Sequence, residues 1–357
     1  MSEDVAEVRR RQAASVTAAL AAYGGALEGK VAVVTGAARG IGCSYVDAFL
    51  RAGMSVAATD KTWAGSEEFE KRLTDDPRAL ALVMDVSDDA QLDRAYEKVM
   101  AAFGRVDVLV NNAGLVSETL FAPHGHVKLL DTRDSDWDAM FKVNVFGAVK
   151  VIRRFVVPMC ESGHGSIINL ISSGVGVQTT GGASFGGRPW SVEMPYQSSK
   201  SALMTAGFYL AQELFEENIA VNSVMPGHTR ASWFDATARS FIDAEEGVYF
   251  LRPVVTEHLI PIILFLASQA AAPSPVTCRV FSAPDWNYEH GYGDYRAWLD
   301  YDMPEDVERS YQKLEAVLPK YWRAGLGRAP FDAEWTAFKA GLEKLALIEE
   351  HQNGAGG

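Results

Sequence analysis

The stretch KVAVVTGAARGIG (residues 30–42) joins an apolar, β-branched run to a glycine-rich turn and the start of a helix. The apolar run predicts a buried strand, and CSYVDAFLRAG (43–53) predicts the helix that follows. Glycines in such a turn let the backbone approach a pyrophosphate, whose charge the helix N-terminus favours. The alternative is a tight connection with no ligand. A second strand at 54–60 completes a βαβ unit.

The same alternation of apolar strands and helices continues to about residue 281. Further strands are expected at 79–86, 106–114, 165–173, 219–227 and 276–281, and helices at 88–103, 134–160, 196–216 and 256–268. Strands that are apolar throughout and separated by helices indicate a parallel sheet covered on both faces. The sequence therefore predicts an α/β fold with a doubly wound parallel sheet of the Rossmann type.

The chain changes character at both ends of this region. An amphipathic helix at 3–22 is expected to belong to an N-terminal helical extension, residues 1–28, of the Rossmann domain at 29–282. Residues 283–357 show no further alternation, and twelve aromatic side chains lie between 283 and 340. We expect a helical, aromatic-rich C-terminal extension. It either covers an apolar substrate as a lid or anchors itself on the domain as a second core.

Composition argues against several kinds of partner. A net charge of −13 without a long basic run argues against nucleic acid, and no apolar run is long enough to span a bilayer. Cys43, Cys160 and Cys278 lie far apart, which suggests neither disulfides nor a zinc site and favours a cytoplasmic location. His124 and His126 have no carboxylate or thiolate nearby, so we expect no metal.

Asp60 ends the second predicted strand, 18 residues after Gly42. A carboxylate there can accept hydrogen bonds from the ribose hydroxyls of a dinucleotide, and it would repel a 2′-phosphate. NAD is therefore favoured over NADP, although Arg39 and Lys61 are close enough in sequence to weaken the preference. The alternative for Asp60 is a turn residue at the end of a strand.

Tyr196 and Lys200 are four positions apart in MPYQSSKSAL (194–203). In a helix the two side chains share one face, so the lysine ammonium would favour the phenolate form of the tyrosine. Tyr196 is therefore a candidate proton-transfer group. Taken alone, the pair is more often an exposed tyrosine beside a solvated lysine.

Six motifs occur together in a recognisable order. They are TGxxxGxG at 35–42, NNAG at 111–114, Asn144 in KVNVFG, the serine pair in INLISS, YxxxK at 196–200 and PG at 226–227. Over about residues 28–281 the chain resembles the short-chain dehydrogenases/reductases, in the subgroup with the TGxxxGxG glycine motif. Each motif alone is weak evidence, but their order and spacing together leave little room for chance.

The resemblance implies a division of catalytic roles. Tyr196 would exchange a proton with the alcohol or carbonyl oxygen of the substrate, and Lys200 would lower the tyrosine pKa and hold the nicotinamide ribose. A serine hydroxyl would hydrogen-bond the reacting oxygen, and Asn144 would support a water-linked proton relay toward Lys200. The serine is ambiguous between Ser172 and Ser173, of which we expect Ser173.

The resemblance also implies a set of residues around an NAD cofactor. They are Gly36, Arg39, Gly40, Ile41, Gly42, Asp60, Asp85, Val86, Asn112, Ala113, Gly114, Tyr196, Lys200, Pro226, Gly227 and Thr229. For Asp85 a helix-capping role is equally compatible with the sequence, and for Asn111 we expect a structural role. Where the family often has a threonine near the carboxamide this chain has Ala231, so Thr229 or Ser232 would substitute.

Two loops are longer than usual for the family, at 115–135 and 174–195, and both are expected at the cleft. Segment 228–258, rich in aromatic residues, lies where the family carries its substrate loop. We predict an NAD-dependent oxidoreductase acting on a bulky, cyclic or sugar-like secondary alcohol or ketone, as a dimer or tetramer of identical chains. The alternatives are an epimerase or dehydratase that retains NAD, or a cofactor-bound sensor or interaction protein.

Overall fold

A computed structural model shows how these segments are arranged. It describes residues 5–122, 125, 127–172, 174–175, 194–231, 233–243 and 252–317. Within them, seven parallel strands form one sheet in the order β3-β2-β1-β4-β5-β6-β7. The strands are β1 Val31–Thr35, β2 Ser55–Asp60, β3 Ala79–Val83, β4 Val108–Asn111, β5 Gly165–Leu170, β6 Ile219–Met225 and β7 Arg279–Ser282. The prediction of a doubly wound α/β fold is confirmed.

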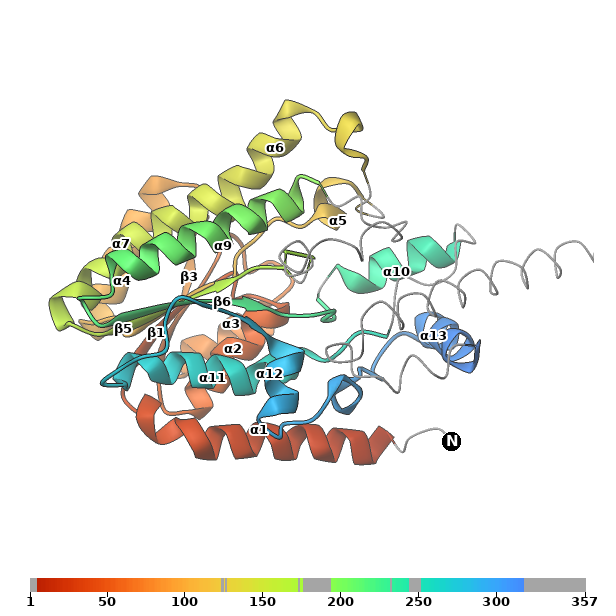
Figure 1. Ribbon diagram of the computed structural model, residues 1–357, viewed down its shortest axis with the longest axis horizontal. Coiled ribbons are helices and arrows are strands. Elements are labelled where there is room, and N and C mark those ends of the chain that lie inside the picture. Colours follow the sequence, from red (N-terminus) through yellow and green to blue (C-terminus); the bar gives the residue numbers. More distant parts are fainter. Residues whose placement is uncertain are drawn as a thin grey trace, which may run out of the picture.

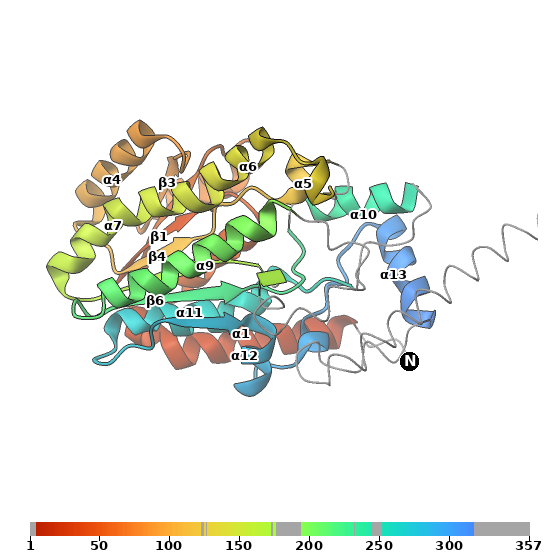
Figure 2. The ribbon, with the colours of Figure 1, turned by 45° about the horizontal axis from the view of Figure 1, so that its top comes forward.

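Helices cover both faces of the sheet (Figures 1 and 2). One face carries α4 (Asp89–Phe103), α7 (Ala148–Ser162) and α9 (Tyr196–Glu213). The other face carries α2 (Gly40–Arg51), α3 (Glu67–Asp75) and α11 (Ile260–Ser268). The N-terminal helix α1 (Val5–Leu27) packs outside α11 and α2. It is longer than the predicted 3–22 and buries Val8, Val16, Ala19 and Leu27.

The continuous apolar strands supply two cores. In β1 the side chains of Ala32 and Val34 belong to the core beneath α2 and α11, whereas Val33 belongs to the core beneath α4 and α7. Successive strand residues point to opposite faces, so a strand covered on both sides must be apolar throughout. This is why the alternating region could be identified from its unbroken apolar runs.

The structure corrects two local predictions. The helix predicted at 134–160 is α6 (Asp134–Phe141), a π-helical turn (Lys142–Gly147) and α7 in succession. Helix α3, between β2 and β3, was not predicted, because it buries only Leu73 and therefore shows a weak apolar pattern.

The described part of the C-terminal extension is helical, as predicted. It consists of α12 (Ala283–Glu289), a 3-10 turn (Tyr295–Trp298) and α13 (Glu305–Val317). The four aromatic side chains of Trp286, Tyr292, Tyr295 and Trp298 are buried in the same core as α11. Trp286 stacks on Tyr292, with ring centroids 5.6 Å apart and 10° between the planes. These aromatic residues anchor the extension on the domain, one of the two roles considered for them, but they do so by joining an existing core and not by forming a second one.

Five of the extension's aromatic residues, Tyr321, Trp322, Phe331, Trp335 and Phe338, lie outside the described residues. Among the helices that the structure describes, none is long and apolar enough to cross a membrane.

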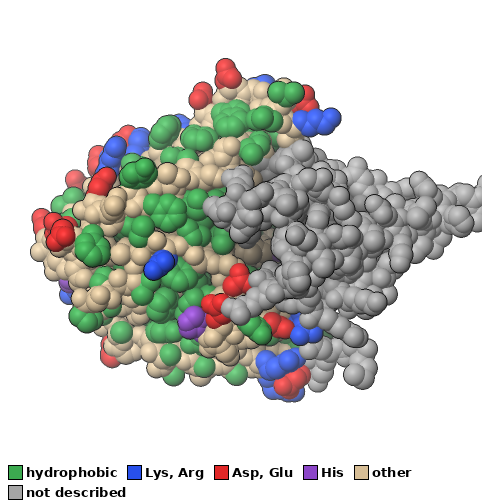
Figure 3. Space-filling view, viewed as in Figure 1, with side chains coloured by type: hydrophobic (Ala, Val, Ile, Leu, Met, Phe, Trp, Pro, Cys, Tyr) green, Lys and Arg blue, Asp and Glu red, His purple; other side chains and the backbone are tan. Residues whose placement is uncertain are grey.

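Apolar side chains also reach the surface on the face that carries α9 and the edge strand β7 (Figure 3). In this part of the chain Tyr209 and Phe215 are 67% and 65% exposed.

Candidate active site

A cleft of about 550 Å³ opens at the carboxyl edge of the sheet. Its walls include the segments that directly follow β1, β2, β3, β4, β5 and β6. Carboxyl ends of parallel strands meet at one edge, and ligands of such folds bind where the strand order reverses, here between β1 and β4. The predicted cofactor residues that line the cleft are Gly36, Arg39, Gly40, Ile41, Asp60, Asp85, Val86, Asn112, Ala113, Gly114, Tyr196, Lys200, Pro226, Gly227 and Thr229.

The glycine turn after β1 is shaped for a close backbone approach. Gly36 has a φ of +66°, and a Cβ atom there would lie 2.8 Å from the Cα atom of Ala113. Gly42 does not line the cleft; a Cβ atom there would lie 2.7 Å from the Nδ2 atom of Asn112, so its role is to let α2 pack against the turn. No described side chain caps the N-terminus of α2. The turn and helix end therefore suit a pyrophosphate.

Asn112 holds this turn in place. Its Nδ2 atom donates hydrogen bonds of 2.9 Å to the carbonyl oxygens of Thr35 and Gly36. In return, the hydroxyl oxygen of Thr35 accepts from the backbone N–H groups of Asn112 and Ala113. The neighbouring Asn111 donates to Asn169 Oδ1 at 2.9 Å between β4 and β5, the structural role expected of it.

The two carboxylates predicted near the adenosine both line the cleft. Asp60 accepts from the backbone N–H of Ala38 at 3.1 Å, so it is tied to the glycine turn as well as exposed to the cleft. Asp85 accepts from the backbone N–H of Ser87 at 2.8 Å. The residue that caps α4 is Asp88, which accepts from the backbone N–H of Gln91, so the helix-capping alternative for Asp85 is wrong.

Tyr196 and Lys200 lie on one face of α9, at its first turn. The lysine Nζ atom is 5.8 Å from the centroid of the tyrosine ring and donates to the carbonyl oxygen of Leu170 at 2.8 Å. Lys200 is only 4% exposed, and this burial lowers its pKa to about 8. The alternative interpretation, an exposed tyrosine beside a solvated lysine, is therefore wrong for the lysine.

Asn144 lies behind the cleft, in the π-helical turn between α6 and α7. Its Oδ1 atom accepts from the backbone N–H of Leu115 at 2.7 Å, and its Nδ2 atom lies 2.9 Å from Ser199 Oγ. A Cβ atom built on Gly114 would lie 3.3 Å from both Asn144 Oδ1 and Lys200 Nζ. The asparagine therefore adjoins the lysine, and single π-helical turns frequently mark functional sites.

Of the two candidate serines, Ser172 lines the cleft and its hydroxyl oxygen accepts from the backbone N–H of Gly174 at 3.3 Å. Ser173 lies outside the described residues, as do Ser232 and the pair His124 and His126.

Behind Thr229, outside the residues that line the cleft, lies a histidine that sequence reasoning did not select. The Nε2 atom of His258 lies 2.9 Å from Thr229 Oγ1, and that hydroxyl is also 3.0 Å from the carbonyl oxygen of Pro226. His258 is 1% exposed and comes from the 3-10 turn before α11. A lone histidine in a polar stretch carries no sequence signal, so only the fold could reveal it.

Residues 30–240 match the sequence profile of the family described as short chain dehydrogenase. The chain belongs to this family. The prediction of an oxidoreductase acting on a CH–OH group is therefore confirmed.

Two curated relatives align with different shares of this chain. Fluoren-9-ol dehydrogenase of Terrabacter sp. (strain DBF63) is 53% identical over 342 residues, which is 96% of this chain and 94% of that enzyme. The 3-oxoacyl-(acyl-carrier-protein) reductase of Thermotoga maritima is 33% identical but covers 69% of this chain and 93% of its own.

Solved structures of the family are similar over the Rossmann part. The 3-ketoacyl-(acyl-carrier-protein) reductase from Brucella melitensis, complexed with NADH, matches with a TM-score of 0.58 and 28% identity, over 72% of this chain and 97% of its own. L-sorbose reductase from Gluconobacter frateurii, complexed with NADPH and L-sorbose, matches with a TM-score of 0.59 and 26% identity, over 71% of this chain and 95% of its own. Members of the family thus bind either nicotinamide dinucleotide.

Proposed function

We propose that this short-chain dehydrogenase oxidises a bulky, cyclic secondary alcohol and prefers NAD over NADP. The observation that carries the proposal is the buried Lys200 ammonium, 5.8 Å from the ring of Tyr196 at the floor of the cleft. A binding or sensor protein does not need a tyrosine beside a cation withdrawn from water. Fluoren-9-ol dehydrogenase, whose named substrate is a fused-ring secondary alcohol, supports the substrate class.

Tyr196 is the group that takes the alcohol proton. A phenol near its reference pKa of about 10 is a weak base at neutral pH, and a cation close to the ring favours the phenolate. The Leu170 carbonyl oxygen holds the ammonium in that place through the 2.8 Å hydrogen bond. Ser172 or Ser173 orients the substrate oxygen toward the tyrosine.

The chain's residues also fit a nicotinamide dinucleotide. When bound, that group supplies the acceptor for the hydride that leaves the alcohol carbon. The glycine turn and the N-terminus of α2 would hold its pyrophosphate, and Asp60 would accept from the ribose hydroxyls. Arg39 and Lys61 are exposed at the same end of the cleft, but the carboxylate is tied to the turn, so it favours NAD.

Part of the cleft wall is apolar. Leu115, Val116, Val143 and Trp233 line the cleft together with Tyr196. An aromatic ring and aliphatic side chains around the acid/base group suit a fused-ring or cyclic alcohol better than an extended polar one. This lining supports the bulky substrate proposed above.

The proposal is tested by following NADH formation with fluoren-9-ol as the probe alcohol. We expect NADH release by the unmodified protein and a loss of about 1000-fold or more in kcat for Tyr196→Phe, since the phenol oxygen is the only atom removed. The affinity for NAD, measured by calorimetry, should change less than about threefold. The substitution removes only the tyrosine oxygen and leaves all other predicted cofactor residues in place.

Tyr209→Phe is the matched control, because Tyr209 lies on the same helix and is 67% exposed. It should keep full activity. Tight NAD binding without NADH release from any cyclic alcohol would instead support an epimerase, a dehydratase or a sensor.

We also propose that the chain acts as a homo-oligomer, with the exposed Phe215, between α9 and β6, as part of the contact. Sedimentation velocity of the protein and of a Phe215→Asp variant tests this. A monomer in both cases would exclude it.

A further inference from the structure

The cleft wall that follows β6 is hydrogen-bonded to the C-terminal extension through one intermediate segment. The backbone N–H of Arg230 donates to the carbonyl oxygen of Val254, and that of Val254 donates to His228. On the other side of segment 252–255, the backbone N–H of Val255 donates to the carbonyl oxygen of Trp298. The backbone N–H of Asp300 donates to the carbonyl oxygen of Pro253. Val254 thus forms a parallel bridge with Thr229 and an antiparallel bridge with Leu299.

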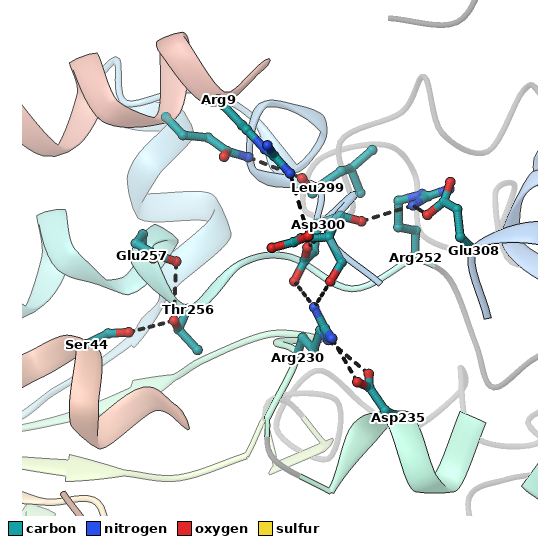
Figure 4. Close-up of polar contacts among 12 residues, drawn as sticks. Arg9, Ser44, Arg230, Asp235, Arg252, Thr256, Glu257, Leu299, Asp300 and Glu308 are labelled. Atoms are coloured by element: carbon teal, nitrogen blue, oxygen red, sulfur yellow. Dashed lines mark hydrogen bonds and ion pairs between the residues drawn. The ribbon is translucent and has the colours of Figure 1, made fainter. Parts of the chain in front are cut away.

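Arg230, in the cleft wall, joins α10 to the extension through its side chain (Figure 4). It donates two hydrogen bonds, of 2.9 and 2.8 Å, to the carboxylate of Asp235 in α10 (Phe234–Asp243). Its Nη1 atom donates to Asp300 Oδ2 at 3.2 Å and also to the carbonyl oxygen of Asp302. One guanidinium therefore ties the helix after the cleft wall to the extension.

Arg252 makes a second and more deeply buried connection. Its guanidinium is fully buried and donates to both carboxylate oxygens of Glu308, at 2.6 and 2.8 Å. It also donates to the carbonyl oxygen of Asp300 at 3.0 Å, and it lies over the rings of Tyr301 and Tyr311. A bidentate ion pair has a defined direction as well as strength, so α13 is held in one orientation on segment 252–255.

Helices α10 and α13 also pack directly on each other. The ring of Phe234, which is fully buried, stacks on Tyr311 with centroids 6.3 Å apart. Trp233, the residue before it, lines the cleft. A shift of α13 would therefore move Phe234, and with it the adjacent Trp233 in the cleft wall.

The shares of the chain that align with its relatives agree with a role for the C-terminal extension. An alignment that covers 96% of the chain, as with fluoren-9-ol dehydrogenase, must include most of residues 283–357. The 3-oxoacyl-(acyl-carrier-protein) reductase of Thermotoga maritima covers 93% of its own length while aligning with only 69% of this chain. A reductase of the family can thus be built with a much shorter chain.

We propose that Asp300, Glu308 and Tyr311, here called the anchor residues, position the Trp233 wall of the cleft and so determine which alcohol is accepted. None of the anchor residues is among the described residues that line the cleft, so they act on the substrate through Arg230, Arg252 and Phe234. The substrate class in this inference rests on the proposed function, whereas the positioning itself does not.

The test compares Glu308→Gln with Glu305→Gln. Both residues lie on α13, but Glu308 pairs with the buried Arg252, whereas Glu305 pairs, within the part of the chain that the structure describes, with the exposed Arg309. With fluoren-9-ol we expect Glu308→Gln to raise KM about 10-fold, with kcat and the dissociation constant of NAD within about twofold of the unmodified protein. Glu305→Gln should change none of these, and a KM equally unaffected in both variants would overturn the proposal.

A second readout does not depend on the substrate. Hydrogen exchange followed by mass spectrometry should show faster exchange at residues 228–238 in Glu308→Gln than in Glu305→Gln, with the strands β1 and β4 unchanged. Equal exchange there overturns the inference even if fluoren-9-ol is oxidised. If fluoren-9-ol is not oxidised, the proposed function fails and this exchange alone decides.

Should Glu308→Gln fail to fold, Asp300→Asn carries the test. Arg230 keeps its pair with Asp235 in that variant, so the change is milder. The same increase in KM and in hydrogen exchange is expected, and their absence contradicts the proposal.

Discussion

Thr229 and His258 share a hydrogen bond of 2.9 Å between Oγ1 and Nε2, which joins the cleft wall to the turn before α11. Burial lowers the pKa of His258 to about 3. The imidazole is therefore neutral at physiological pH and serves as a fixed hydrogen-bonding group. On its other side, the carbonyl oxygen of His258 accepts from Asn287 in α12 at 2.7 Å. The histidine thus connects the cleft wall at Thr229 to the extension.

This burial predicts an acid-sensitive stability. An unfolded histidine has a pKa of 6.5 and the folded one about 3, so between these pH values the unfolded chain binds more protons. The free energy of unfolding should therefore fall as the pH falls through that interval. His258→Asn should flatten the decrease between pH 6.5 and about 4.5, where few carboxylates titrate. Urea unfolding at several pH values measures this, and an equally steep decrease in the variant would contradict it.

Asp107 should stabilise the sheet at the amino ends of its strands, opposite the cleft, without affecting catalysis. Its carboxylate has no exposed surface; it accepts from the backbone N–H of Val31 at 2.9 Å and pairs with Arg105 at 2.5 Å. Although burial raises its pKa, the Arg105 and Val31 hydrogen bonds and the nearby Lys30 charge hold the pKa below the ordinary value.

Asp107→Asn should lower the free energy of unfolding by about 2–3 kcal/mol near neutral pH and leave kcat unchanged. Since the folded pKa is depressed, this stabilisation is present above the unfolded pKa of about 3.9 and is lost as the pH falls through the folded value. The difference between the two proteins should therefore shrink in acid. Thermal melts at pH 7 and pH 3 provide the measurement. If the stability difference between the unmodified protein and Asp107→Asn is as large at pH 3 as at pH 7, the stabilising role of the ionised Asp107 is contradicted.

Gly42→Ala should disturb the dinucleotide turn. A methyl group there would lie 2.7 Å from Asn112 Nδ2, which also holds Gly36. We expect a loss of about 1–3 kcal/mol in unfolding free energy and at least about 10-fold weaker NAD binding by calorimetry. Gly25→Ala is the control, since a methyl group in α1 meets nothing within 4 Å. Gly25→Ala should be at least as stable as the unmodified protein. If Gly42→Ala and Gly25→Ala bind NAD with the same affinity, the predicted role of Gly42 is contradicted.

Asp60→Ala should reduce the preference for NAD over NADP. The carboxylate lies in the cleft beside Arg39 and Lys61, so its removal leaves two cations near a 2′-phosphate. We expect the ratio of kcat/KM for NAD to that for NADP to fall about 10- to 100-fold, the range for a hydrogen bond to a charged group. An unchanged ratio with an unchanged melting temperature would show that Asp60 only supports the turn through Ala38.

Much of the site could be predicted from sequence because it follows strand ends. Gly36, Asp60, Asn112 and Pro226 each come directly after, or end, an apolar strand, and the parallel sheet brings such positions together. The mistakes have local causes. The capping role considered for Asp85 belongs to Asp88, because both lie in one acidic turn whose geometry the sequence does not specify.

The sequence by itself determined the succession of strands along the chain, the glycine turn and the helical spacing of Tyr196 and Lys200, since each depends on residues close together in the chain. Only the tertiary structure decided that Lys200 is withdrawn from water, that His258 meets Thr229 and that Arg252 meets Glu308. These contacts join residues far apart in sequence, and a pKa depends on the atoms that surround the group. No local pattern encodes that environment.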